Sequence, residues 1–244
     1  MTRAPSSTVT VATAGWALPA SVRDSFGDGA SALARYATRL AGAEINSSFH
    51  RPHRRSTYER WAATVPDRFR FAVKLPKTIS HEKRLIACDD AIAAFAEESA
   101  GLGDKRAVIL VQLPPSLGFD PAFAAFFDSL QARLRATIAC EPRHPSWFDP
   151  AVDAWLVERR IARVAADPAR HADAGRPGGW RGLTYYRLHG SPVIYRSAYD
   201  ADTLDAIAAA LRDDPAAARW CVFDNTAASA ALPDALALTA LLDG

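Results

Sequence analysis

The stretch ATIACEPRHPSWFDP, residues 136–150, contains the structural unit that repeats along this chain. Its apolar run, Ala136–Glu141, has the length and composition of one strand and ends in polar side chains. Asp149 followed by Pro150 is a typical helix start, because aspartate accepts hydrogen bonds from free N–H groups and proline fits the first turn. The pattern Val152–Arg159 then supplies an apolar helical face. This stretch predicts a strand followed by a helix.

Apolar runs of the same kind recur with a spacing of roughly 30 residues, which is the size of one strand–helix–strand step. Strands alternating with helices predict a parallel sheet, and eight such runs favour closure into a barrel. The expected strands are Val9–Ala14, Ala43–Asn46, Phe69–Leu75, Ala107–Leu113, Ala136–Glu141, Ile161–Ala165, Leu183–Leu188 and Trp220–Phe223.

Helical patterns occupy the intervals between most of these runs. Asp120-Pro121 offers a second start signal, and Ser56 with Glu59 resembles a capping box. The segment His171–Arg181 is rich in glycine and proline and is expected to be a loop. We therefore predict an α/β fold: a single TIM-type (β/α)8 barrel over residues 1–244, with one helix replaced by a loop after the sixth strand. The other helical patterns are Ala32–Leu40, Ile92–Ser99, Phe123–Leu134, Leu204–Leu211 and Ala235–Leu242.

The composition fits one large domain in a reducing compartment. The 244 residues are 49% hydrophobic, and 29 basic against 27 acidic residues give a net charge of +2, which neither requires nor excludes a polyanionic partner. Cys88, Cys140 and Cys221 have no metal-binding spacing and are expected to be buried thiols. The N-terminal stretch MTRAPSSTVTVATAGW lacks the apolar core of a leader. No apolar run reaches the roughly 18 residues of a membrane span, so we expect a cytoplasmic protein without membrane contact.

Polar side chains stand at or just after the ends of the expected strands. In a parallel barrel these ends meet at one rim, where catalytic residues are found. Residues two apart on a strand share a face, so Glu141 with Arg143 and Arg187 with His189 are expected to converge. The residues predicted for the site are Trp16, Glu44, Asn46, Lys74, Gln112, Glu141, Arg143, His144, Arg187, His189, Asp224 and Asn225.

Lys74, Arg143 and Arg187 end alternate strands, whose side chains share a layer in a TIM barrel. They are therefore expected to surround one oxyanion, with the arginines providing forked donors and the lysine a point charge. The alternative is that these cations only pair with the carboxylates nearby. A divalent metal is another alternative, but no compact metal motif supports it and no cofactor is assigned. Its ligands would be Glu44, Glu141, Asp167, His189 and Asp224.

Aromatic and basic loop residues suggest two further roles. Four loop aromatics are expected on the same rim, either to stack on a ligand or to pack as a lid: Trp16, Trp147, Trp180 and Tyr195. Trp61 and Trp155 instead have the spacing of core residues. Nucleic-acid binding would use the basic loop after the second strand for phosphate contacts. The loop residues in question are Arg51, Arg54 and Arg55.

Six ordered stretches resemble the motifs of the YecE-like proteins, a bacterial and archaeal family whose domain has no known function. They are EINSSFHRP (44–52), FRFAVKLPKTISH (69–81), LVQLPPSLGF (110–119), EPRHPSWF (141–148), YYRLHGSP (185–192) and CVFDNTAASAA (221–231). The resemblance covers nearly the whole chain, from about Gly15 to about Leu238. It implies a TIM-barrel fold and places the predicted site residues, with His81, on family motifs; Trp16 is not part of these motifs. Ser229 departs from the glycine that is usual in the last motif. The resemblance implies no reaction.

We therefore expect an enzyme, or the descendant of one, that binds a small anionic ligand carrying a phosphate at the rim. Glu44 or Glu141 would act with His189 in acid–base catalysis, and the other predicted residues would bind the ligand. One alternative is a nucleic-acid-binding barrel, including a nuclease. The other is a sensor or scaffold that binds its ligand without turnover. The motifs of serine hydrolases, P-loop enzymes and dinucleotide-binding proteins are absent from the sequence.

Overall fold

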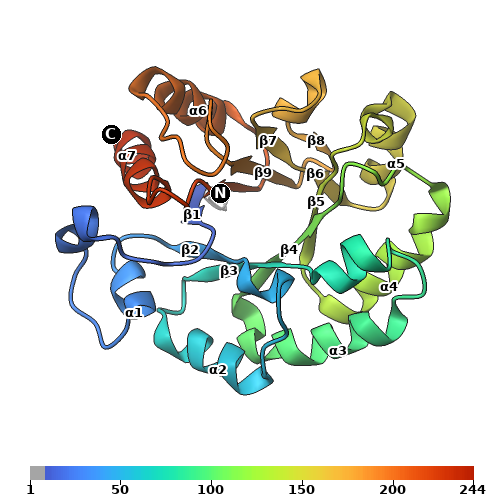
Figure 1. The fold of residues 1–244 in the computed structure, drawn as a ribbon, viewed down its shortest axis with the longest axis horizontal. Coiled ribbons are helices and arrows are strands. Elements are labelled where there is room, and N and C mark those ends of the chain that lie inside the picture. The colour runs from blue at the N-terminus through green and yellow to red at the C-terminus, as the bar shows by residue number, and fades with distance from the viewer. Residues whose placement is uncertain (1–8) are drawn as a thin grey trace, which may run out of the picture.

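Strands run through the centre of the molecule and helices lie around them, as Figure 1 shows. The structure is a computed structural model in which residues 9–244 are described. Residues 1–8, part of the stretch expected to lack a leader, lie outside the described residues. The strands are β1 (Val9–Thr13), β2 (Gly42–Ile45), β3 (Arg70–Lys74), β4 (Arg106–Gln112), β5 (Thr137–Glu141), β6 (Ile161–Arg163), β7 (Ala165–Asp167), β8 (Gly178–Gly179), β9 (Leu183–Leu188) and β10 (Ala218–Phe223).

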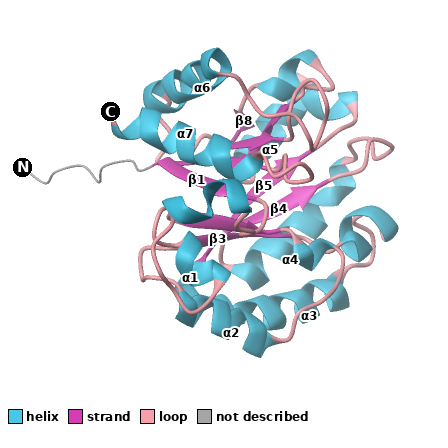
Figure 2. Ribbon diagram, turned by 60° about the vertical axis from the view of Figure 1, so that its left-hand side comes forward, coloured by secondary structure: helices cyan, strands magenta, loops and turns pink. Residues whose placement is uncertain are grey.

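Helices cover the outer faces of the strands, with α6 and α7 on one side and α2 and α3 on the other in Figure 2. None of the helices in the described part of the chain is both long and apolar enough to cross a bilayer. The α-helices are α1 (Ala32–Tyr36), α2 (Arg55–Thr64), α3 (Asp89–Ser99), α4 (Ala124–Leu134), α5 (Pro150–Glu158), α6 (Ala201–Asp213) and α7 (Ala231–Asp243).

The strands form two sheets, of four strands in the order β1-β10-β9-β7 and of six in the order β2-β3-β4-β5-β6-β8. All neighbours are parallel except β8, which runs antiparallel to β6. The predicted single barrel is thus not closed by hydrogen bonding. At one seam β6 pairs with β5 while β7, one residue further on, pairs with β9. The other seam lies between β1 and β2. Within residues 9–244, the strand-type pairing across it is limited to one isolated bridge between Ala14 and Glu44.

Two hydrophobic clusters follow from the alternation of side chains along the strands. The inner cluster combines residues of both sheets, such as Ala72, Ala139, Tyr185 and Val222. The outer, larger cluster packs the other faces of the strands against the helices and contains all three cysteines, which are buried and free. This confirms the expectation of buried thiols. Side chains two residues beyond the inner cluster then face the space enclosed by the strand ends.

Two of the three predicted helix-start signals are confirmed. Asp120 and Asp149 each accept a backbone N–H two residues on and are followed by proline, as predicted. The capping box at Ser56 is wrong, because α2 already begins at Arg55 and places Ser56 inside its first turn. Glu59 instead forms an ion pair with Arg55 at 3.0 Å.

The segment between β7 and β9 contains no α-helix, in agreement with the predicted loop. It forms a short helical turn at Ala172–Gly175 and then β8. Gly179 has a φ of +61°, and a Cβ there would lie 2.5 Å from the carbonyl oxygen of Ile161. Glycine therefore permits the close antiparallel contact that ends the six-stranded sheet.

Candidate functional site

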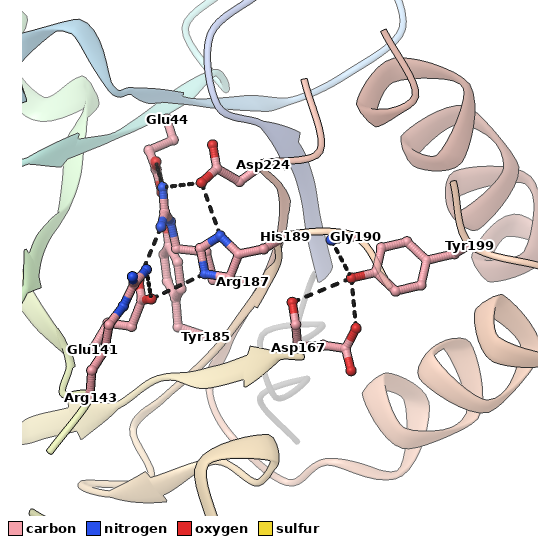
Figure 3. A network of polar contacts seen from close by, with 10 residues as sticks. All are labelled: Glu44, Glu141, Arg143, Asp167, Tyr185, Arg187, His189, Gly190, Tyr199 and Asp224. Carbon is pink, nitrogen blue, oxygen red and sulfur yellow. Dashed lines mark hydrogen bonds and ion pairs between the residues drawn. The ribbon is translucent and has the colours of Figure 1, made fainter. Parts of the chain in front are cut away.

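Charged side chains from both sheets meet at the carboxyl ends of the strands (Figure 3). All except Glu44 lie near a strand end, two or four positions after an inner-cluster residue: Glu141 follows Ala139, and Arg187 follows Tyr185. The alternation of a strand thus directs Glu141 and Arg187 inward. The charged set consists of Glu44, Lys74, Glu141, Arg143, Arg187, His189 and Asp224, and all except Arg143 are buried.

Arg187 is fully buried and lies at the centre of this set. Its Nε and Nη2 donate to the two carboxylate oxygens of Glu44 at 3.1 and 2.9 Å. Its Nη2 also contacts Oδ2 of Asp224 at 2.9 Å, and its Nη1 donates to Oε2 of Glu141 at 3.1 Å. These contacts engage most of the guanidinium donors. Arg187 therefore holds the carboxylates together and has little capacity left for a ligand.

His189 lies between two of the same carboxylates. Its Nδ1 is 3.0 Å from Oδ2 of Asp224, and its Nε2 is 3.1 Å from Oε1 of Glu141. Burial alone would lower the pKa of His189, but Glu141 and the hydrogen bonds to both carboxylates reverse this and raise the pKa above its ordinary value. A protonated ring can donate to both carboxylates at once, so the geometry favours the imidazolium.

The pKa values of the carboxylates are shifted in the opposite direction. Burial would raise the pKa of Glu141, but Arg187, then His189 and Arg143, hold the pKa well below its ordinary value. The pKa of Asp224 is lowered in the same way: burial opposes the shift, and Arg187, His189 and Lys74 outweigh it. Both groups are therefore ionised at neutral pH.

Lys74 differs from the other cations of the site because its Nζ makes no hydrogen bond or ion pair with any residue from 9 to 244. The residue is only 6% exposed, and its Nζ lies 4.2 Å from the centre of the Phe49 ring. Burial, and then the charge of Arg187, lower its pKa to about 8, although Glu44, Glu141 and Asp224 oppose the shift.

A narrow, partly open cleft lies beside Glu141 and His189, with a cavity volume of about 20 Å³. Arg143 lies at its edge, where its side chain is 14% exposed and Nη2 donates to Oε1 of Glu141 at 3.1 Å. Arg170 adds a further cation. The remaining lining is largely apolar and consists of Pro142, Phe148, Ala166, Pro168, Ala174 and Ile194.

A family model described as "Protein of unknown function DUF72" matches residues 10–244. The chain belongs to the DUF72 family. This confirms the resemblance to YecE-like proteins, since the curated relatives include the UPF0759 protein YecE of Escherichia coli K12, which is 31% identical over 156 residues. That match covers 61% of this chain and 56% of the relative, so the chain matches little more than half the length of YecE. The YecE protein of Escherichia coli O157:H7 is 30% identical over the same shares.

Solved DUF72 structures have the same fold at low sequence identity. A DUF72 family protein from Enterococcus faecalis V583 has a TM-score of 0.81 at 20% identity, with 97% of this chain and 96% of that chain covered. A second, from Thermotoga maritima MSB8, has a TM-score of 0.75 at 18% identity, with coverage of 97% and 99%. These similarities establish the fold of the DUF72 chain and carry no information on its ligand.

Other residues predicted for the DUF72 site lie outside the charged set. His144 caps the turn Pro145–Phe148, accepting from the N–H of Ser146. Asn225 is fully buried, and its Nδ2 donates to Ser197 and Asp234, away from the charged set. Gln112 is buried at the end of β4.

Two further predicted ligand residues make no hydrogen bond or ion pair with the charged set within residues 9–244. Trp16 packs edge-on against Trp61 and Phe71 and lines a separate pocket beside β1. The side-chain oxygen of Asn46 is enclosed without a hydrogen-bond partner. Neither side chain lines the cleft next to Glu141.

Only some of the loop aromatics lie where the sequence predicts them. Trp147 is fully buried and donates its indole N–H to the carbonyl of Leu117, so it serves packing rather than stacking. Trp180 lies at the opposite, amino-terminal end of the strands, where its backbone N–H donates to the carbonyl of Ile161. Tyr195 does lie over the site, with its ring edge-on to His189 at 5.6 Å. Trp61 and Trp155 pack against the outer cluster, as predicted.

Two tyrosines of the site were missed by sequence reasoning. Tyr185 donates to Glu44 at 3.0 Å, and its position two residues before Arg187 on the same strand face was an available signal. Tyr199 donates to Asp167 at 2.8 Å and accepts the N–H of Gly190 at 2.8 Å (Figure 3). No strand pattern indicates Tyr199, because it lies in the long connection before α6.

The carboxylates do not form a metal centre in the part of the chain that the structure describes. No group of three or more histidine, cysteine, aspartate or glutamate side chains is placed to hold one ion there. The physical reason is that the guanidinium of Arg187 occupies the position between the carboxylates. Asp167, included in the metal alternative, accepts from Tyr199 instead.

Proposed function

We propose that this DUF72 protein binds a small, phosphate-bearing anion at the carboxyl ends of its strands and is an enzyme or the descendant of one. The observation that carries the proposal is the cation of Lys74, which is buried within the charged set and has no carboxylate partner among residues 9–244. With His189 protonated, four cationic groups face three carboxylates. An excess positive charge in a poorly solvated place attracts an anion.

Arg143 and Lys74 are the ligand-binding cations of this proposal. Arg143 donates to Glu141 and also contacts the side chain of Tyr195, and its remaining donors lie at the edge of the cleft. Arginine can hold a phosphate with two parallel hydrogen bonds, and the lysine ammonium adds a point charge. Arg187, the third cation predicted to surround the oxyanion, is not assigned to ligand binding because its donors are engaged by carboxylates.

Glu141 and His189 are the acid–base pair of this proposal, because both line the cleft and contact each other at 3.1 Å. A histidine with a raised pKa can deliver a proton at neutral pH and recover it through its carboxylate partners. Glu44 is enclosed by Arg187 and Tyr185, so we assign it a positioning role rather than the catalytic role expected from the sequence.

We further infer that the two sheets are one TIM-type barrel, interrupted at two seams, and that residues 1–244 are one domain. The shared inner cluster and the bridge between Ala14 and Glu44 support this interpretation. A cytoplasmic location remains part of the proposal. Nucleic-acid binding has weaker support, because Arg55, one of its expected phosphate contacts, is engaged by Glu59 and Glu97.

Calorimetric titration with inorganic phosphate tests the binding site. Arg143→Ala should weaken binding by about 2 kcal/mol, roughly 30-fold in Kd, because it removes a charged hydrogen bond in a partly desolvated place. The matched control is Arg133→Ala, since Arg133 is an exposed arginine on α4 and its loss changes the net charge equally. Equal affinities of the two variants, or no binding by the wild type, would refute the anion site. Binding without turnover of any phosphorylated compound would favour the alternative of a sensor or scaffold that binds its ligand without catalysis.

A further inference from the structure

Lys74 stands apart from the other three lysines of the chain. Lys77 pairs with Glu82 at 3.3 Å, Lys83 donates to the carbonyl of Ala87, and Lys105 donates to two backbone carbonyls. Lys74 Nζ has none of these partners in the described residues, yet it is not among the fully enclosed unpartnered atoms, so it keeps contact with solvent. It is therefore largely desolvated but not fully enclosed.

The surroundings of Lys74 combine an apolar surface with acid–base groups. The Phe49 ring lies directly against the Nζ, at 4.2 Å from its centre. Glu141 and Asp224, the two carboxylates that hold His189, are near enough to act on Lys74 electrostatically. A lysine next to another cation and an apolar wall is a typical amine nucleophile.

We propose that Lys74 forms a Schiff base with a phosphorylated aldehyde or ketone. This inference rests on the proposed function, because Arg143 would hold the phosphate while the carbonyl carbon lies against Lys74. The ligand class is thereby narrowed from any phosphate-bearing anion to a phosphorylated carbonyl compound.

The step balances without an oxidant or a further reactant. The neutral amine of Lys74 attacks the carbonyl carbon, a C–N bond forms, and the carbonyl electron pair moves to oxygen, which takes a proton from His189. The nitrogen then loses a proton to the pair formed by His189 and Glu141. Return of that proton to the hydroxyl expels water and leaves the carbon–nitrogen double bond.

The ionisation of Lys74 supports this chemistry. Burial, and then Arg187, lower the pKa of the ammonium to about 8, while Glu44, Glu141 and Asp224 oppose this shift. About a tenth of the molecules then carry the neutral, nucleophilic amine at pH 7, against less than about a thousandth for an ordinary lysine. The difference should make Lys74 the preferred target among the four lysines.

Borohydride trapping tests the inference directly. The protein is incubated with dihydroxyacetone phosphate, reduced with sodium borohydride, and mapped by peptide mass spectrometry. We expect a reduced adduct on Lys74 at least tenfold more abundant than on Lys77. Lys74→Arg should abolish it while retaining the charge, and the matched control Lys77→Arg should leave it unchanged. Unphosphorylated dihydroxyacetone should give at least tenfold less adduct.

The outcomes separate this inference from the anion site. Phosphate binding by calorimetry together with adducts spread evenly over the lysines, or with none, would overturn the Schiff base and leave the anion site standing. Selective labelling of Lys74 that is equal for both probes and unaffected by Arg143→Ala would support the nucleophile and refute the anion site. The wild-type adduct distribution decides the matter even if Lys74→Arg fails to fold.

Discussion

Replacement of Arg187 by methionine should be among the most destabilising substitutions in this protein. The side chain is fully buried, and its loss leaves the carboxylates of Glu44, Glu141 and Asp224 enclosed together without their shared cation. Breaking a buried pair by removing one partner destabilises by about 3–5 kcal/mol. Because a domain of this kind has a total stability of about 5–15 kcal/mol, urea unfolding should show a large fall in midpoint at nearly constant slope.

The loss of stability in Arg187→Met should shrink as the pH falls. In the wild type, the lowered pKa values of Glu141 and Asp224 contribute stability that is present above the unfolded pKa and lost as the pH falls through the folded pKa. In the variant, burial without the cation raises the folded pKa of the carboxylates. Protonation of these carboxylates at lower pH therefore stabilises the native state of the variant. The two unfolding free energies should therefore converge between about pH 7 and about pH 4.

Two comparisons make this test specific. Arg55→Met removes two exposed ion pairs and should leave the midpoint nearly unchanged. Glu44→Gln in the Arg187→Met background should restore part of the stability, because one unpaired carboxylate disappears. A loss below about 1 kcal/mol for Arg187→Met, or a loss that grows in acid, would show that the guanidinium does not neutralise the cluster.

Three other predictions follow from the same structure. The raised pKa of His189 gives stability that is present below about pH 6.5 and lost as the pH rises through the folded value, so wild-type urea stability should fall above about pH 6.5 while His189→Gln stays flatter. Burial raises the pKa of the thiols of Cys140 and Cys221, so a thiol reagent should label neither in the native protein and both in urea; rapid native labelling would contradict the strand register. Tyr199→Phe leaves the buried N–H of Gly190 without its acceptor and should lower the unfolding free energy by about 1–3 kcal/mol, whereas an unchanged midpoint would mean that water replaces the hydroxyl.

The sequence allowed the strands and the charged set to be predicted because both depend on local periodicity. A run of apolar residues marks a strand, and alternation then fixes which polar residue at its end faces inward, as for Glu141 and Arg187. The direction of a side chain beyond the strand end depends on the turn that follows. His144 is used as a cap and Asn225 as a brace for a loop, and neither use has a signature in the spacing.

The two-sheet arrangement could not be predicted for a different reason. Closure depends on whether neighbouring strands stay in register over their whole length, which is a long-range property. The sixth predicted strand, Ile161–Ala165, pairs with β5 in its first part and is continued by β7, which pairs with β9. The sequence stays hydrophobic across this change of partner strand, so the apolar pattern does not indicate where the pairing changes.

The packing of Arg187 suggests why so many charges are buried in one place. Apolar side chains of similar volume would stabilise such a core as well or better, so stability alone is a poor reason for a buried arginine with three carboxylates. The same carboxylates also fix both ring nitrogens of His189 and the guanidinium of Arg143. Arg187 thus orients Glu141 and Asp224, which in turn orient His189 beside the cleft. We infer that the cluster is retained in this chain as a rigid support for an acid–base group, and Lys74 is the cation that the support leaves unpaired.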